Sequence, residues 1–221
     1  MSAKRQKKQC YLCGRTDKLT SDHLPPKGFF NKPYPPNLIT VPCCYKCNNG
    51  WSKEDEFVRA ILALSDIGRS QAGNEVFYGS VLRRLRENNQ PLLEWLLSRM
   101  TDVVVQSDEG VPLELTRFDF TPDMLDRFNK YFERMTKGFI RHFHPDVDYS
   151  GATFVVHFVD DRRKLEEMRP LLKQLRYDEK GAEVFRLGHS VTETGAGGFF
   201  HYQFYGATEV VAYFSDRPLC A

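Results

Sequence analysis

The sequence has no hydrophobic run long enough to cross a membrane. A membrane-spanning helix needs about 20 consecutive apolar residues, and no stretch of the 221 residues approaches that length. The basic segment MSAKRQKKQ at the start is not followed by the apolar stretch that a secretory signal requires. We therefore expect a cytoplasmic protein, in which thiols stay reduced and paired cysteines are metal ligands more often than disulfides.

Acidic residues are scarce at the start of the chain. Residues 1–53 contain two Asp or Glu and ten Lys or Arg, a formal charge of +8, whereas residues 54–221 contain 27 acidic and 21 basic residues, a formal charge of −6. A basic first segment on a mildly acidic body favours a polyanionic partner that the first segment meets. Repeats and low-complexity tracts are also absent, and a composition with 41% hydrophobic residues is not that of a disordered chain.

Cysteine is uncommon, with six residues in all, but four of them stand in two Cys-x-x-Cys pairs. Two such pairs can supply the four thiolates of a tetrahedral zinc site, because each pair gives two ligands from one tight turn. The predicted zinc ligands are Cys10, Cys13, Cys44 and Cys47. The neighbouring Cys43 is either an alternative ligand or a small packed residue, and Cys220 has no expected role.

A carboxylate and an imidazole, Asp22 and His23, lie between the two cysteine pairs. Metal-assisted hydrolysis of a phosphodiester needs an activated water and a cation on the phosphate oxygens. His23 suits the general base because the unperturbed pKa of histidine lies near neutrality. Asp22 and Asn48 offer the hard oxygen ligands that Mg²⁺ requires. Because thiolates do not suit that ion, the sequence implies two metals, a structural zinc and a catalytic divalent ion.

These motifs resemble the HNH nuclease family, which has the ββα-metal fold. The matching segments are Cys10-Tyr-Leu-Cys13, Asp22-His23-Leu24-Pro25-Pro26, Asn37, and Cys44-Tyr-Lys-Cys47-Asn48. The resemblance implies that His23 is the general base and that Asp22 and Asn48 hold the catalytic ion. It also implies that Asn37 orients the loop that positions His23. The expected activity is hydrolysis of nucleic acid, with DNA as the expected substrate and a 5′-phosphate as the product.

The resemblance covers about a quarter of the chain and leaves alternatives open. The third signature position is Asn48 rather than His, and Asn49 could serve in its place. Asn37 could be an ordinary turn residue before a strand. If His23 only belongs to a structural loop, the protein is a non-catalytic zinc-binding module for nucleic acid or protein.

Several basic side chains are candidates for contacts with nucleic acid. Lys27, Lys46 and Lys53 lie beside the motifs, and a helical stripe carries Arg127, Lys130 and Arg134. Such side chains can neutralise backbone phosphates. A solvated protein surface is the alternative interpretation of both sets.

The pattern of the whole chain predicts an α+β protein. Residues 1–67 are expected to form the nuclease module, ending in a helix that Ser52 caps and Gly68 stops. A boundary near residues 68–74 should separate it from an α+β domain over residues 75–221, with helices and an antiparallel sheet. In that domain we expect a helix that Thr121 caps, with Leu125 and Phe128 facing inward. This second domain has no chemical motif; it could position DNA, bind a protein partner, form a homodimer, or act as a sensor in a defence system.

Overall fold

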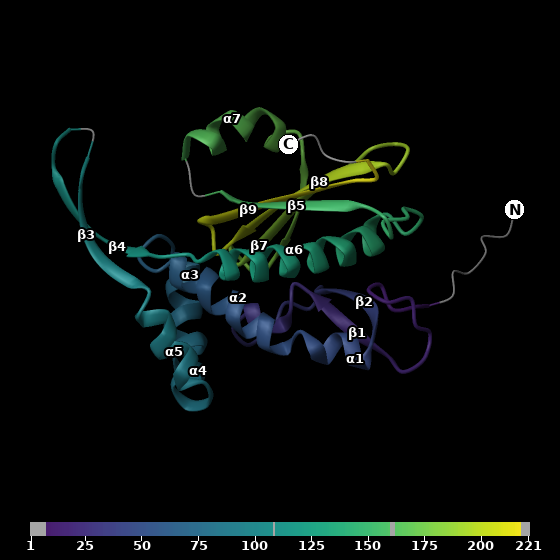
Figure 1. Ribbon diagram of the computed structural model, residues 1–221, viewed down its shortest axis with the longest axis horizontal. Helices are drawn as coiled ribbons and strands as arrows, with labels where there is room; N and C mark the ends of the chain where they lie inside the picture. Colours follow the sequence, from purple (N-terminus) through teal and green to yellow (C-terminus); the bar gives the residue numbers. More distant parts are fainter. Residues whose placement is uncertain (1–7, 108, 160–161, 218–221) are drawn as a thin grey trace, which may run out of the picture.

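The computed structural model describes residues 8–107, 109–159 and 162–217. The first residues of the predicted basic arm, and Cys220, lie outside the described residues. The chain is a mixed α+β protein, as predicted, with an N-terminal cysteine cluster and antiparallel sheets (Figure 1). None of the described helices is both long enough and apolar enough to cross a membrane.

The N-terminal part is built on a two-stranded antiparallel hairpin followed by helices. In order along the chain, its elements are β1 (Leu19–Leu24), the short 3₁₀ turn η1 (Lys27–Phe29), β2 (Ile39–Cys44), α1 (Tyr45–Gly50) and α2 (Ser52–Ser65). The β-branched run that ends at Val41 favours β2. Pro25 and Pro26 end β1, since proline cannot donate a ladder hydrogen bond.

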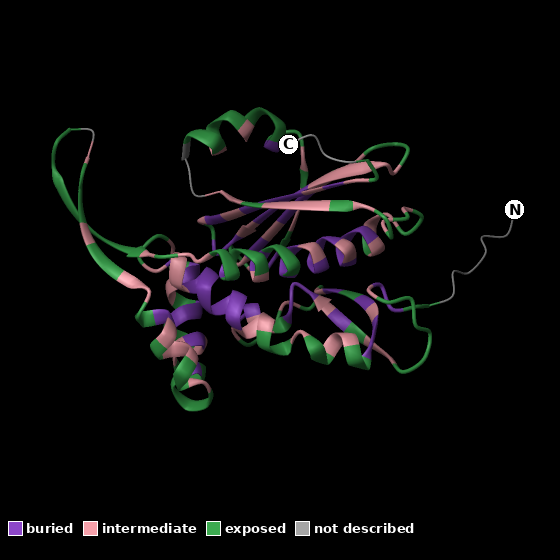
Figure 2. Cartoon of the chain, viewed as in Figure 1, coloured by how far each residue is buried: buried purple, intermediate pink, exposed green. Residues whose placement is uncertain are grey.

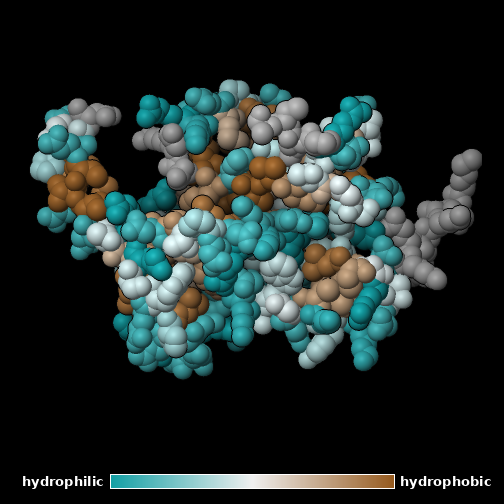
Figure 3. Space-filling model, in the orientation of Figure 1, coloured by the Kyte–Doolittle hydropathy of each residue, from teal (hydrophilic) through white to brown (hydrophobic). Residues whose placement is uncertain are grey.

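The middle of the chain forms helices and a second hairpin. Its elements are α3 (Gln71–Val76), the π-helical segment η2 (Phe77–Val81), α4 (Leu82–Asn88), α5 (Gln90–Leu97), β3 (Met100–Gln106) and β4 (Pro112–Phe118). The segments α3, η2 and α4 follow one another without a break, so helical structure begins at Gln71, inside the boundary predicted near residues 68–74. The β3–β4 hairpin projects from the body (Figure 1), and Figure 3 shows a brown patch on this otherwise mostly hydrophilic arm. The exposed apolar side chains of the hairpin are Val104, Val105, Val111, Leu113 and Leu115.

The C-terminal part supplies the central helix and the main sheet. Its elements are α6 (Pro122–Phe143), β5 (Thr153–Val159), α7 (Arg162–Leu172), β6 (Arg176–Lys180), β7 (Phe185–Val191), β8 (Gly197–Phe204) and β9 (Thr208–Ser215). The five strands form one antiparallel sheet in the order β5-β9-β8-β7-β6. An antiparallel sheet in this part of the chain agrees with the prediction.

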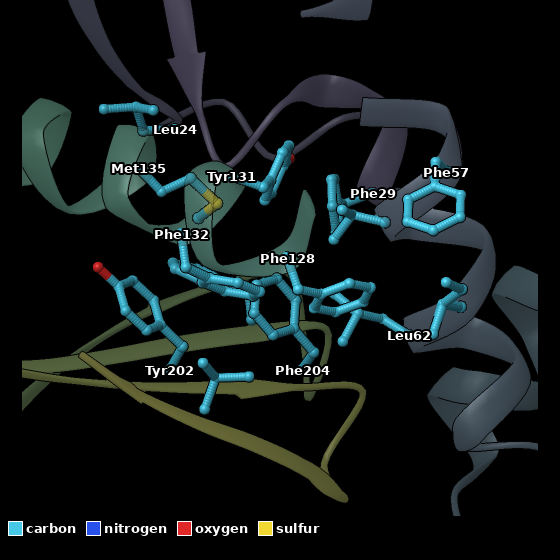
Figure 4. Packing of buried hydrophobic residues seen from close by; sticks show 14 of the residues in the cluster. Leu24, Phe29, Phe57, Leu62, Phe128, Tyr131, Phe132, Met135, Tyr202 and Phe204 are labelled. Atoms are coloured by element: carbon cyan, nitrogen blue, oxygen red, sulfur yellow. The ribbon is translucent and has the colours of Figure 1, made fainter. Parts of the chain in front are cut away.

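Helix α6 lies between the main sheet and the N-terminal hairpin (Figure 1). On one side Phe132 contacts Tyr202 of β8, with ring centroids 5.4 Å apart, and on the other Tyr131 stacks on Phe29 at 6.4 Å. Figure 4 shows these two sets of side chains on opposite sides of the helix. The buried residues form one continuous core that runs across the boundary predicted near residues 68–74 (Figure 2).

The helix begins and packs largely as its sequence predicts. The side chain of Thr121 accepts a hydrogen bond from the backbone N–H of Met124, and Pro122 occupies the first turn, where a missing N–H costs nothing. Phe128 is buried as expected, but the prediction for Leu125 is wrong, since Leu125 is 44% exposed. Gly138 lets α6 approach β1 closely, because a Cβ there would collide with the side chain of Leu24.

The start of the first long helix differs from the prediction. Helix α1 already begins at Tyr45, with Cys44 preceding it, so Asn48 lies inside a helical turn rather than ahead of the helix. Ser52 does not cap α2: the capping position is Trp51, and the Ser52 hydroxyl donates to the carbonyl of Asn49 at 3.1 Å. The short α1 arises because the second cysteine pair closes as a helical turn.

One buried carboxyl group makes the stability of the fold depend on pH. Asp66 follows α2 and is fully buried, and burial raises the pKa of its carboxyl group to about 6. Its nearest cation, Arg69, is 3.7 Å away and mostly exposed. Because the folded pKa lies above the unfolded value, ionisation costs stability as the pH rises from about 4 to about 6.

We therefore expect Asp66→Asn to stabilise the protein relative to wild type increasingly over that interval. The difference in the free energy of unfolding should grow by about 2 kcal/mol between pH 4 and pH 7. Urea denaturation at a series of pH values measures it. Asp17→Asn, at an exposed position, is the control. A difference that does not change with pH would show that Asp66 ionises normally in the folded state.

Candidate metal centre and the adjoining hairpin

The two cysteine pairs come together at one end of the β1–β2 hairpin. The first pair forms a tight turn in which the Gly14 N–H donates to the carbonyl of Cys10 at 2.9 Å. Gly14 has a φ of +72°, a conformation that glycine adopts without strain. The second pair joins the last residue of β2, Cys44, to the first turn of α1. The Tyr45 N–H donates to the carbonyl of Lys18 at 3.0 Å, which fixes the second pair to the start of β1.

The four predicted thiols form one cluster. The sulfur atoms of Cys10, Cys13, Cys44 and Cys47 all lie within 4.8 Å of one another. A tetrahedral zinc with Zn–S bonds of about 2.3 Å requires sulfur atoms about 3.8 Å apart, and those of Cys13 and Cys44 are 3.6 Å apart. Four soft sulfur donors at this spacing fit a metal ion such as zinc, which would cross-link the two turns.

The electrostatics of the cluster favour a thiolate at one position. Burial acts against the charged form of Cys10, but backbone N–H groups of Cys44, Cys13 and Leu12 favour it and lower the pKa of the thiol to about 6. By contrast, burial raises the pKa of Cys43, whose sulfur lies 3.9 Å from that of Cys10. Cys43 is fully buried and is not part of the four-sulfur cluster, so it fits the packed-residue interpretation.

His23 lies on β1, opposite Thr40 of β2, and is partly exposed. Burial and the positive charge of Lys27 lower the pKa of its imidazole, and the carboxylate of Asp22 only partly offsets them. The ring is therefore neutral at pH 7. A neutral, accessible imidazole can accept a proton.

Asp22 points to the opposite face of β1, because successive strand residues alternate in direction. It is 3% exposed, and its Oδ2 accepts hydrogen bonds from the Tyr11 hydroxyl at 2.8 Å and from the Arg134 guanidinium at 2.7 Å. Arg134, on α6, is 2% exposed and also donates to Asp55 of α2 at 2.8 Å. Its guanidinium lies 5.2 Å from the centroid of the Trp51 ring. We call these five residues the Arg134 cluster.

The three predicted asparagines occupy different environments. Asn48, in α1, donates from its side chain to the hydroxyl of Thr20 at 3.0 Å. Thr20 is two residues before Asp22, so Asn48 faces the same side of the hairpin as Asp22. Asn49, the next residue, is exposed. Asn37 lies in an exposed turn before β2, with no side-chain hydrogen bond among the described residues.

Asp22 and Asn48 do not form a ready magnesium site in this arrangement. The charge of Asp22 is compensated by Arg134, and a buried carboxylate that already pairs with a guanidinium has little to gain from a second cation. Binding of a divalent ion at Asp22 would require the carboxylate to exchange its partner.

The predicted basic contacts are only partly accessible. Lys27, Lys46 and Lys53 are exposed around the hairpin and the start of α2. On α6, Lys130 is exposed and pairs with Asp126 at 2.6 Å, while Arg127 pairs with Glu54 at 3.0 Å. The structure corrects the sequence analysis at Arg134, which is buried in the Arg134 cluster and has no surface to offer to a phosphate.

The residues that surround Asp22 were not predicted from the sequence. Tyr11 lies inside the first cysteine pair and Asp55 in the first turn of α2, so neither position indicates a buried partner for Asp22. Arg134 carries a signal that was available: it lies three residues after Tyr131 and four before Gly138, the spacing of the buried face of α6.

No protein-family model matches the chain, and no curated protein or solved structure matches it either.

The four-cysteine cluster leads to a prediction about zinc. Cys44→Ala should abolish stoichiometric zinc and lower the thermal midpoint, because a structural zinc contributes directly to folding free energy. Cys43→Ala removes a neighbouring buried thiol outside the cluster and should retain one zinc per chain. Metal analysis of both purified variants tests this. Loss of zinc in Cys43→Ala with retention in Cys44→Ala would reassign the ligand.

The Arg134 cluster leads to a prediction about stability. Arg134→Met should destabilise the protein by about 3–5 kcal/mol, because it leaves the Asp22 carboxylate buried without its cation. Urea denaturation gives the value. Lys130→Met, which removes an exposed cation one turn earlier on the same helix, should leave the midpoint nearly unchanged. Equal midpoints for the two variants would mean that Asp22 does not depend on Arg134.

Proposed function

We propose that the protein is a metal-dependent endonuclease that hydrolyses phosphodiester bonds of nucleic acid, with DNA as the expected substrate. The observation that carries the proposal is a neutral, partly exposed His23 on a hairpin that a four-cysteine cluster anchors at its other end. The order of these residues along the chain, with Asn48 after the last cysteine, supports it through the resemblance to HNH nucleases.

In the proposed reaction, His23 acts as the general base. The oxygen of a water molecule bonds to phosphorus while its proton passes to the imidazole of His23. The bond between phosphorus and the 3′-oxygen breaks, and that oxygen takes a proton from solvent. The products are a 5′-phosphate and a 3′-hydroxyl. The resemblance assigns a catalytic Mg²⁺ or another divalent ion to Asp22 and Asn48, and in the arrangement described above this ion would have to displace Arg134 from Asp22.

The Arg134 cluster favours a second candidate function. If Asp22 serves only to hold α6 against the hairpin, the protein is a zinc-containing module that binds nucleic acid or protein without cleaving it. The buried pair of Asp22 and Arg134, at 2.7 Å, is the observation in its favour. The two candidates differ in one measurable outcome, which is cleavage.

Cleavage of plasmid DNA in Mg²⁺, Mn²⁺, Ni²⁺ or excess EDTA tests the proposal. The wild type should nick the plasmid in at least one metal and not in EDTA. His23→Ala should lose about 10²–10⁴-fold in rate, since general-base catalysis contributes that much. His157→Ala, which removes an exposed histidine on β5, should cleave as the wild type does.

Metal analysis of each variant distinguishes activity lost through loss of zinc from activity lost through removal of the general base. Full activity of a zinc-loaded His23→Ala protein would rule out the assigned base. Absence of cleavage in every metal, with binding of DNA retained, would favour the second candidate.

A further inference from the structure

A basic groove begins beside the Arg134 cluster and runs between the loop after η1 and helices α2 and α4. It consists of two adjoining cavities of about 180 and 840 Å³. The smaller cavity begins at Pro26, Ser52 and Asp55, and the larger one ends at Glu87 and Asn88. Both are lined by Gly28, Glu56, Arg59 and Arg84, so they form one continuous depression.

Arg59 lies at the junction of the two cavities and is the most unusual residue of the groove. It is 5% exposed, and its guanidinium donates to the carbonyl of Gly28 at 2.8 Å. Among the described residues no carboxylate lies within ion-pair distance of it. A guanidinium has five N–H donors, and a buried cation without an anion is costly. Burial has the largest effect on the pKa of Arg59 and lowers it; Arg84 acts in the same direction, whereas Tyr205 and Glu56 act in the opposite one.

The rest of the lining adds positive charge. Lys32, Arg83 and Arg84 line the larger cavity with Arg59, against the carboxylates of Glu56 and Glu87. Glu56 is already engaged, since it accepts hydrogen bonds from Arg84 at 3.1 Å and from Asn89 at 2.8 Å. Polar groups that could support a bound anion also line the cavity, among them Asn31 and Tyr34.

We propose that this groove binds the phosphate groups of a nucleic-acid strand, with Arg59 and Arg83 as its principal contacts. Planar guanidinium groups match phosphate oxygens in geometry as well as in charge. Arg59 lines both cavities and Arg83 lines the larger one, so a single strand lying in the groove can contact both guanidinium groups. The choice of nucleic acid as the source of the phosphates rests on the proposed function.

The experiment measures binding apart from cleavage. The zinc-loaded His23→Ala protein is the background, with no divalent ion added, and the probe is a fluorescent single-stranded DNA oligonucleotide followed by anisotropy. Arg83→Ala should weaken binding about tenfold, the worth of one charge-assisted contact. It should also reduce the slope of log affinity against log salt by about 1.

The matched control is Arg86→Ala. Arg86 lies on the same helix and is exposed, but it does not line the groove. Arg86→Ala removes the same charge as Arg83→Ala. It should change the affinity less than twofold, because a long-range electrostatic effect is screened by salt. Arg59→Gln should weaken binding at least as much as Arg83→Ala, and a thermal melt identifies a variant that has lost its fold. Arg83→Ala, at an exposed position, keeps the test valid if Arg59→Gln does not fold.

Two competitors identify the source of the phosphate. An oligonucleotide with an uncharged methylphosphonate backbone should not displace the probe, whereas the unlabelled natural strand should. If the probe does not bind, and inorganic pyrophosphate at constant ionic strength raises the thermal midpoint of the wild type but not that of Arg83→Ala, the groove is a small-anion site and the proposal is overturned. Equal losses of DNA affinity in Arg83→Ala and Arg86→Ala would also overturn the proposal, because they would indicate attraction by the general positive charge of the surface.

The outcomes separate this inference from the proposed function. If the wild type cleaves plasmid and the groove variants bind normally, the groove assignment is wrong and the nuclease stands. If no metal supports cleavage but Arg83→Ala selectively loses binding, the groove stands and the nuclease assignment is wrong.

Discussion

A buried arginine holds the two halves of this protein together. Arg134 of α6 lies between the carboxylates of Asp22 on β1 and Asp55 on α2, and it is withdrawn from water almost completely. Removing a charge from water costs several kcal/mol, so such a residue persists only where its partners are fixed. The aromatic packing around it supplies that rigidity, with Tyr131 against Phe29 on one side of α6 and Phe132 against Tyr202 on the other. The two ion pairs of Arg134 therefore help to set the position of β1, and with it that of His23.

The cysteine cluster and the Arg134 cluster act on the hairpin from different ends. The cysteines close the end where β1 begins and β2 finishes, and Arg134 fixes Asp22 further along β1. Between them the hairpin has little freedom. His23, on the face turned away from α6, is the partly exposed titratable group of that strand, whereas Asp22 has become a structural anion. Adjacent residues of one motif thus have opposite environments, because strand geometry sends their side chains to opposite faces.

Local chemistry explains which features could be predicted from the sequence. The cysteine spacing and the Thr121 cap each depend on neighbouring residues, and the four-cysteine cluster and the start of α6 were predicted correctly. The Ser52 cap failed because the cysteine turn itself became helical, which no local propensity indicates. The partners of Asp22 could not be identified, since Arg134 is 112 residues away and an arginine in an amphipathic helix is usually solvated. The groove could not be predicted for the same reason, since Arg59 and Arg83 line one cavity only once α2 and α4 lie beside each other.

The distance between Asp22 and Arg134 along the chain also has a consequence for the order of folding. A contact between residues so far apart in the sequence closes a long loop. The chain in that loop loses conformational entropy before the contact gives any stability. During synthesis, at roughly 5–20 residues per second, the hairpin leaves the ribosome several seconds before α6. Throughout that interval Asp22 is a hydrated carboxylate and Phe29 has no Tyr131 to pack against. The metal cluster can form at once, because all its ligands lie within residues 10–47. The N-terminal hairpin is therefore a module that metal can shape early and that the C-terminal half completes late.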